Sequence, residues 1–266
     1  MVEKRVFDLS GKVALITGGG GGLGRVFCES LAEFGANVVC TDWDKQKLNN
    51  TVTLLNNAGY RAIAIKADIT KPDEIQNMVD ETVKQLGTID ILFNNAGITC
   101  SSTKIHETPI ADWDRVINTN LRGQFLCMRA VLPVMLKQKS GCIINISSIG
   151  ALGAGDTEMA PASYGVSKSG VICLTKYAAM EYAKSGIRVN CIAPGIHETD
   201  LGIPQNAQEA EQRKVYMHEF VNRNVPLGRI AQPIELKGLA VLLASDASSY
   251  ITGQVFIQDG GQTIRI

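Results

Sequence analysis

Residues 12–24 read KVALITGGGGGLG and decide the fold class. The run from Val13 to Thr17 is apolar and rich in β-branched side chains, which is typical of a buried strand. The glycines that follow permit a tight turn and leave the backbone bare, and the chain then continues in a helical pattern. A strand that turns directly into a helix predicts a strand–helix–strand unit and therefore a parallel α/β sheet.

The same alternation recurs along the chain. Further strands are expected at residues 38–41, 62–66, 91–94, 142–146, 187–192 and 255–257. Helices are expected at about 22–34, 44–57, 72–86, 113–137, 162–184 and 233–244. With right-handed crossovers, this order predicts a single-domain Rossmann fold over residues 1–266, a seven-stranded parallel doubly wound sheet with helices on both faces.

Composition and charge exclude several classes of protein. Lys+Arg and Asp+Glu both number 26, so the net charge is zero and a nucleic-acid binder with a basic surface is excluded. No apolar run reaches the roughly 18 residues of a membrane span, and the charged first residues are unlike a signal peptide. The seven cysteines lack metal-ligand or disulfide-framework spacing. We therefore expect a reduced cytoplasmic protein without a metal, membrane or nucleic-acid partner.

The glycine run has the form of a phosphate-binding turn. Gly19, Gly21 and Gly24 fit Gly-x-Gly-x-x-Gly, whereas Gly18, Gly22 and Gly24 fit Gly-x-x-x-Gly-x-Gly. A bare backbone can approach a pyrophosphate, and the N–H groups at the start of a helix donate to it. A merely flexible turn is the alternative, but the position between strand and helix favours a dinucleotide.

An acidic residue at the end of the second expected strand indicates which dinucleotide binds. Asp42 follows Gly18 by 24 residues, and a carboxylate there accepts hydrogen bonds from the adenosine ribose hydroxyls and repels a 2′-phosphate. Asp42 therefore predicts NAD rather than NADP. An exposed turn aspartate is the alternative, and Arg25, Lys45 and Lys47 leave NADP open as the less favoured cofactor.

Tyr164 and Lys168 stand four residues apart in an expected helix and so share one face. A nearby ammonium lowers the pKa of a phenol from its reference value near 10, which makes tyrosine usable as an acid or base. Taken alone, the pair is more often a solvated helix face than a catalytic pair.

The pair is accompanied by other motifs, and with them the sequence resembles the short-chain dehydrogenase/reductase family over essentially its whole length. The matching segments are residues 17–24, Asp42, Asp68–Thr70, Asn94–Gly97, Asn120–Gly123, Asn145–Ser148, Tyr164–Lys168, Pro194–Gly195 with Thr199, and Asp259–Gly261. The resemblance selects the glycine template of Gly18, Gly22 and Gly24.

The resemblance implies an oxidoreductase that interconverts a secondary alcohol and a ketone by hydride transfer with NAD. Tyr164 would be the general acid/base, and Lys168 would lower its pKa and bind the nicotinamide ribose. Ser148 would hydrogen-bond the substrate oxygen, and Asn120 would order a water in a proton relay. The implied cofactor-binding residues are Gly18, Gly22, Leu23, Gly24, Asp42, Asp68, Ile69, Asn95, Ala96, Gly97, Tyr164, Lys168, Pro194, Gly195, Ile196 and Thr199. Asn94 or Asn95 is expected to stabilise the sheet instead.

Two features depart from the family pattern. The spacing of 16 residues from Ser148 to Tyr164 is longer than usual, and the extra residues in 153–160 would line the substrate mouth. Ser147 is the fallback for the serine. Tyr177 and Lys184 match the Tyr-x6-Lys spacing of enoyl reductases, but we interpret them as helix surface.

Substrate and assembly are less constrained by the sequence. Residues 197–225 are expected to form a lid, with His197 as a pocket wall or surface residue rather than a catalyst. Their mixed polarity favours a small polyol or sugar-derived alcohol over a steroid or other apolar cyclic ketone. The apolar helices near 113–137 and 162–184 predict a homotetramer, as in the family. An NAD-binding sensor or scaffold without turnover is the alternative, and a methyltransferase would leave Tyr164 and Lys168 unexplained.

Overall fold

One parallel sheet gathers strands from almost the whole chain. The computed structural model describes residues 6–153, 160–203 and 206–265. The strands are β1 (Val13–Thr17), β2 (Asn37–Asp42), β3 (Ala62–Lys66), β4 (Ile91–Asn94), β5 (Gly141–Ile146), β6 (Ile187–Pro194) and β7 (Val255–Gln258). They lie in the order β3-β2-β1-β4-β5-β6-β7, and all neighbours pair in parallel. The predicted fold class is therefore confirmed.

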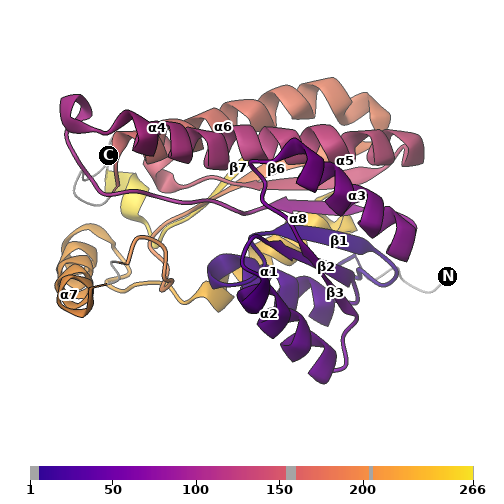
Figure 1. Cartoon of the computed structure of the whole chain (residues 1–266), viewed down its shortest axis with the longest axis horizontal. Coiled ribbons are helices and arrows are strands. Elements are labelled where there is room, and N and C mark those ends of the chain that lie inside the picture. Colours follow the sequence, from indigo (N-terminus) through magenta and orange to yellow (C-terminus); the bar gives the residue numbers. More distant parts are fainter. Residues whose placement is uncertain (1–5, 154–159, 204–205, 266) are drawn as a thin grey trace.

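Helices cover both faces of the sheet (Figure 1). They are α1 (Gly22–Glu33), α2 (Lys45–Asn57), α3 (Pro72–Leu86), α4 (Ile110–Ile117), α5 (Gln124–Gln138), α6 (Ala162–Tyr182), α7 (Ala207–Asn224) and α8 (Lys237–Ala244). One core lies between the sheet and α1, α2 and α8, and the other lies between the sheet and α3, α5 and α6. In β1, Ala14 and Ile16 face the first core while Val13 and Leu15 face the second. This explains why the strand is apolar throughout rather than alternating.

The expected helix 113–137 is wrong as a single α-helix. A π-helix from Asn118 to Gly123 separates α4 from α5. The wide turn is held by tertiary contacts, since the Asn120 side chain bonds to both backbone groups of Ile98 and to Ser167. A π-turn of this kind is often found at functional sites.

The expected lid contains one long helix, α7, which stands apart from both helical layers (Figure 1). Asn206 caps α7 by accepting hydrogen bonds from the N–H groups of Gln208 and Glu209. Residues 204–205 of this segment, and residues 154–159 of the expected substrate mouth, lie outside the described residues.

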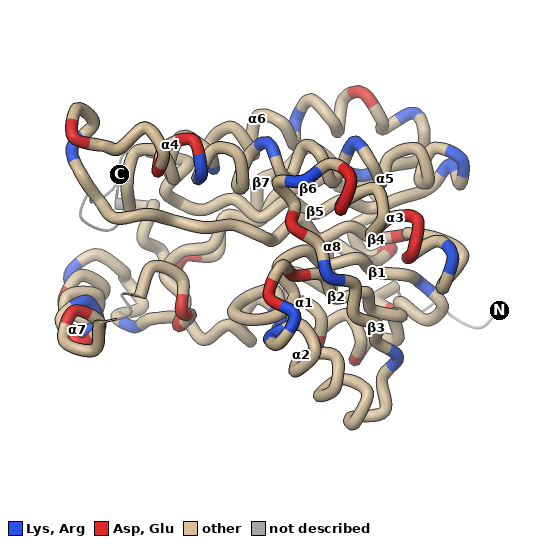
Figure 2. Tube along the Cα trace, viewed as in Figure 1, with Lys and Arg blue, Asp and Glu red and all other residues tan. Residues whose placement is uncertain are grey.

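The surface carries charges of both signs and a few apolar side chains. Acidic and basic residues interleave along α7, whereas α3 is mostly acidic and has Lys84 in its last turn (Figure 2). Among the apolar side chains of the two helices expected to pair between subunits, Met128 and Val131 of α5 are buried within the chain, whereas Tyr177 and Met180 of α6 are 66% and 84% exposed. In the described part of the chain, no helix combines the length and the apolar character needed to cross a membrane.

Candidate active site

The loop between β1 and α1 is built for close backbone approach. Gly18 and Gly22 have φ angles of +67° and +51°, which favour glycine. A Cβ on Gly24 would overlap the Gly18 carbonyl oxygen, so this position has room only for glycine. Gly21 caps α1 without a side-chain hydrogen bond, so no side chain competes for the N–H groups at the start of the helix. These features fit a dinucleotide pyrophosphate.

Asp42 lies at the end of β2 beside the glycine loop. Its Oδ2 accepts a hydrogen bond from the Gly20 N–H at 3.1 Å, and its Oδ1 accepts one from the Asp44 N–H at 3.0 Å. The carboxylate is therefore fixed in position. Arg25 is engaged elsewhere, because its Nε donates to Glu29 at 2.8 Å.

The two asparagines after β4 hold the sheet and the loop together. Asn94 is buried and donates to Asn145 Oδ1 at 3.0 Å, so it stabilises the sheet, as expected for one of the pair. Asn95 Nδ2 donates to the carbonyls of Thr17 and Gly18 at 3.0 and 3.3 Å. The structure thus places Asn95 as a brace behind the glycine loop.

Tyr164 and Lys168 share one face of α6, as their spacing predicts. Lys168 Nζ lies 5.7 Å from the centre of the Tyr164 ring and donates to the Ile146 carbonyl at 2.8 Å. The lysine is only 3% exposed, and burial lowers its pKa to about 8. Burial raises the pKa of Tyr164, while a hydrogen bond from Ser148 acts in the opposite direction.

Ser148, rather than Ser147, faces the tyrosine. Ser148 precedes a short 3-10 helix (Ile149–Ala151), and its Oγ accepts a hydrogen bond from the Gly150 N–H at 3.2 Å. Ser147 is buried and donates to the Lys168 carbonyl at 2.7 Å. The hydroxyl of Ser147 is therefore committed to α6, which favours Ser148 as the substrate-facing serine.

Asn120 reaches the same place from the π-helix. Its Oδ1 accepts from the Ile98 N–H at 2.8 Å, and its Nδ2 donates to the Ile98 carbonyl at 2.9 Å. A Cβ on Gly97 would lie 3.2 Å from Asn120 Oδ1 and 3.3 Å from Lys168 Nζ. Gly97, Asn120 and Lys168 therefore meet just beyond β4.

The other predicted cofactor residues lie around the carboxyl ends of the strands. Asp68 follows β3 and accepts hydrogen bonds from Thr70, while Ile69 is largely buried. Pro194 ends β6, and the Gly195 N–H donates to the Gln258 carbonyl at 2.9 Å. Leu23 packs against the core beneath α1, and the Ala96 N–H donates to the Thr17 hydroxyl. The methyl of Thr199 lies 3.8 Å from a Cβ built on Gly22, and Ile196 lies nearby, directly after Gly195.

The structure corrects the interpretation of one residue, His197, and adds one that was not predicted, Gln124. His197 is 7% exposed, and its Nδ1–H donates to the Gly195 carbonyl at 3.0 Å. Burial lowers its pKa. It is a buried neutral side chain at the base of the lid. Gln124 was not predicted at all, although its amide reaches the Ile146 carbonyl that also binds Lys168. Its only sequence signal is its position directly after the Asn120–Gly123 motif.

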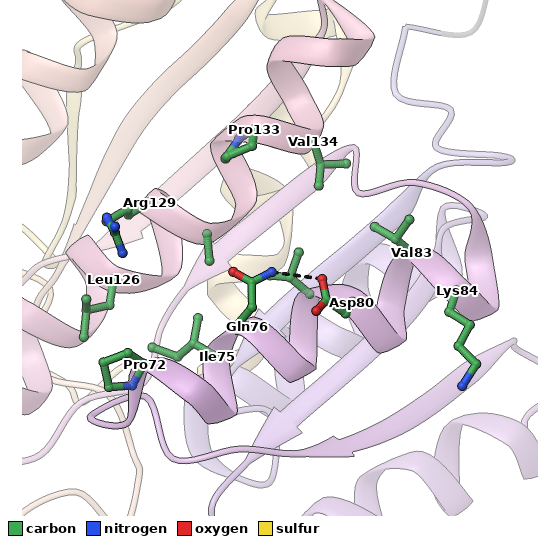
Figure 3. Close-up of a pocket in the computed structure, with 12 residues that line it drawn as sticks. Pro72, Ile75, Gln76, Asp80, Val83, Lys84, Leu126, Arg129, Pro133 and Val134 are labelled. Atoms are coloured by element: carbon green, nitrogen blue, oxygen red, sulfur yellow. Dashed lines mark hydrogen bonds between the residues drawn. The ribbon is translucent and has the colours of Figure 1, made fainter.

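A cavity of about 760 Å³ lies elsewhere, between α3 and α5 (Figure 3). Its lining includes Ile75, Val79, Leu126 and Arg129, and contains none of the predicted site residues. Among the residues that the structure describes, no cluster of three or more His, Cys, Asp and Glu side chains could hold a metal ion.

A glycine loop, an acidic residue at the end of β2 and a buried Tyr–Lys pair are together typical of dehydrogenases and reductases that bind a nicotinamide dinucleotide. The comparisons with known proteins agree. The family model described as enoyl-(acyl carrier protein) reductase matches residues 19–263. The 3-oxoacyl-[acyl-carrier-protein] reductase FabG of Thermotoga maritima is 38% identical over 258 residues, which cover 96% of this chain and 99% of the relative.

Solved structures extend the similarity to the whole fold. A short-chain type dehydrogenase/reductase from Mycobacterium marinum has a TM-score of 0.89 at 36% identity, covering 97% of this chain and 98% of the other. A gluconate 5-dehydrogenase from Burkholderia cenocepacia, in complex with NADP and tartrate, has a TM-score of 0.88 at 33% identity, covering 98% of both chains. The chain therefore belongs to the short-chain dehydrogenase/reductase family, and the oxidoreductase class expected from its sequence is confirmed.

Proposed function

We propose that this protein interconverts a secondary alcohol and a ketone with NAD as the hydride carrier. The observation that carries the proposal is the buried ammonium of Lys168, 5.7 Å from the Tyr164 ring, with Ser148 hydrogen-bonded to the same tyrosine. In this proposal Tyr164 is the proton donor, Lys168 modulates its pKa and the Ser148 hydroxyl binds the substrate oxygen.

The chain's own residues would manage the proton while bound nicotinamide supplies the hydride exchange. In oxidation, Tyr164 as phenolate takes the proton of the alcohol, and in reduction it returns a proton to the carbonyl oxygen. Ser148 hydrogen-bonds that oxygen and stabilises the charge that develops on it. Lys168 favours the phenolate through its charge, and Asn120 lies next to it, where a proton can pass toward solvent.

NAD is the preferred cofactor in this proposal. Asp42 is held at the edge of the loop by two backbone N–H groups, and its charge opposes a 2′-phosphate. The ion pair of Arg25 with Glu29 removes one candidate phosphate ligand. The gluconate 5-dehydrogenase structure contains NADP, so the two cofactors must be compared directly.

For the substrate, we propose a small polyol or sugar-derived alcohol. The segment after β4 passes close to the start of α6, since Cys100 Sγ lies 3.6 Å from Oγ of Ser163, the residue before Tyr164. The similarity to a gluconate 5-dehydrogenase supports a hydroxylated substrate. The FabG relative adds 3-oxoacyl groups as the second class to screen.

The test is a substrate panel of polyols, sugar acids, cyclic ketones and 3-oxoacyl thioesters, assayed with NAD and NADP in parallel. Tyr164→Phe is expected to lower kcat by roughly 10²–10⁴-fold, the contribution of a general acid/base, with little change in NAD affinity. Tyr250→Phe, at a fully exposed tyrosine outside the site, is the matched control and should retain full activity. A Tyr164→Phe enzyme with wild-type kcat contradicts the mechanism. Cofactor binding without turnover on any substrate favours a sensor.

We also propose that the exposed apolar side chains of α5 and α6 mediate association into a tetramer. Phe125 on α5 and Tyr177 and Met180 on α6 are exposed large apolar side chains. Light scattering is expected to give a mass of about four chains of 28.6 kDa, and a single-chain mass contradicts this.

A further inference from the structure

The backbone carbonyl of Ile146, at the end of β5, accepts two side-chain hydrogen bonds. Lys168 Nζ donates to it at 2.8 Å, and Gln124 Nε2 donates to it at 3.2 Å. Both donors are buried. A carbonyl oxygen has two lone pairs and can accept both bonds, but the two donors then share its electron density.

A buried chain of amides fixes Gln124 in this position. Gln124 is the first residue of α5, directly after the π-helix, and its backbone carbonyl accepts from Asn94 Nδ2 at 3.1 Å. Asn94 also bonds Asn145, which donates in turn to Thr175 Oγ1 at 2.9 Å. Since only a donor can face the Ile146 carbonyl, the amide of Gln124 must present its NH₂ group there.

We propose, on the basis of the proposed function, that Gln124 is a positioning residue for the Tyr164–Lys168 pair because it shares the Ile146 carbonyl with the lysine. The Lys168 ammonium is thereby held at the end of β5, but its hydrogen bond to the Ile146 carbonyl is weaker than it would be if the lysine were the only donor. The partial positive charge of the Gln124 NH₂ group also lies close to the ammonium and opposes it. Gln124 thus limits how strongly the protein stabilises the charged form of Lys168.

The direction of the effect follows from this geometry. If Gln124 loses its donor, the carbonyl of Ile146 binds the ammonium more strongly, and the pKa of Lys168 rises above its value of about 8. The titratable groups that face Lys168 are Tyr164 on its own helix and Cys191 on β6. Burial raises the pKa of the Cys191 thiol to about 11, so it stays neutral in the range of interest.

The experiment compares Gln124→Met, which keeps the length and removes the donor, with Gln124→Glu, which adds a negative charge. Thr82→Val is the matched control, because it removes a buried hydroxyl that donates to the Met78 carbonyl in α3 and has no bond to the site. The full-length variants are assayed for kcat and NAD affinity across pH. In parallel, the Lys168 side chain is titrated by ¹³C NMR, with its signal assigned by its loss in Lys168→Met.

In Gln124→Met, the Lys168 titration and the alkaline limb of kcat are expected to move up by about half to one pH unit, the effect of one hydrogen bond. Gln124→Glu should move both further, and Thr82→Val should move neither. An unchanged Lys168 titration in a folded Gln124 variant overturns the proposal. If Gln124→Met does not fold, Gln124→Asn, whose shorter amide cannot reach Ile146, is expected to give the same shift. If the wild-type protein turns over no substrate, the proposed function fails, but the NMR titration still decides the role of Gln124.

Discussion

Replacing Asp42 with asparagine should convert an NAD-preferring enzyme into one with little preference or a preference for NADP. The substitution keeps the shape of the side chain and removes its charge. In the wild-type protein, the carboxylate accepts from the N–H groups of Gly20 and Asp44 at 3.1 and 3.0 Å, so it cannot swing away from a phosphate bound beside it. The repulsion is therefore built into the rigid end of β2.

The size of the effect can be worked from two terms. Two unit charges in contact at about 4 Å repel by roughly 1 kcal/mol in water and 4 kcal/mol near a protein surface, and Asp42 is half-buried. Loss of charge also weakens the hydrogen bonds that the carboxylate offers to the ribose of NAD, by about 1 kcal/mol. Together, the ratio of kcat/KM for NAD to that for NADP should fall by roughly two to three orders of magnitude.

The assay measures kcat/KM for both cofactors with one substrate, at low and high salt. Asp44→Asn is the control, because this neighbouring carboxylate accepts from the N–H groups of Gln46 and Lys47 and caps α2. Because asparagine caps a helix about as well as aspartate, this variant should keep nearly the wild-type stability and leave the cofactor ratio unchanged. A wild-type enzyme that prefers NADP, or an unchanged ratio in Asp42→Asn, would refute this reasoning.

Two further predictions concern stability. Gly24→Ala should lower the free energy of unfolding by about 1–3 kcal/mol and weaken NAD binding, because the new Cβ overlaps the Gly18 carbonyl. Gly21→Ala is the control, since a Cβ there meets nothing within 4 Å, and urea denaturation should show a much smaller loss of stability for it. Lys168→Met should be more stable than the wild type at neutral pH, by up to roughly 3 kcal/mol less the lost Ile146 hydrogen bond. Burial lowers the lysine pKa to about 8 in the folded state, so between about pH 8 and 10.5 the unfolded wild-type protein binds more protons than the folded one. The wild type therefore gains stability as pH rises through that range, and its stability difference from Lys168→Met should shrink. A pH-independent difference contradicts the burial argument.

The strands and the glycine loop could be predicted because local sequence determines them. β1 is apolar on both faces, and α3 is bounded by Pro72 at its start and by Gly87, with φ of +83°, at its end. Such signals depend on residues close together in the chain. The parallel pairing of the strands and the helices on both faces followed from the repeated strand–helix alternation and the handedness of crossovers, whereas the strand order itself was not predicted.

The wide turn at Asn118–Gly123 could not be predicted, because contacts distant in sequence hold it. Asn120 bonds to Ile98 and Ser167, which are 22 and 47 residues away. The shared carbonyl of Ile146 has the same character, since Gln124 lies 22 residues before it and Lys168 lies 22 residues after it. A helical pattern across residues 113–137 gives no sign of either contact.

The sheet order explains why these distant residues meet. The chain reverses its direction of growth between β1 and β4, and ligands of doubly wound sheets bind at such a point, beyond the carboxyl ends of the strands. The glycine loop follows β1 and Gly97 follows β4. The next strand, β5, then holds both ends of the lysine, since the Ile146 carbonyl accepts from its ammonium and Ser147 donates to its backbone carbonyl. The position of the Lys168 ammonium is therefore set by the end of β5 and not by α6 alone. Under the proposed mechanism, substitutions that shift this strand end should alter the pH dependence of the enzyme even where they leave the helix intact.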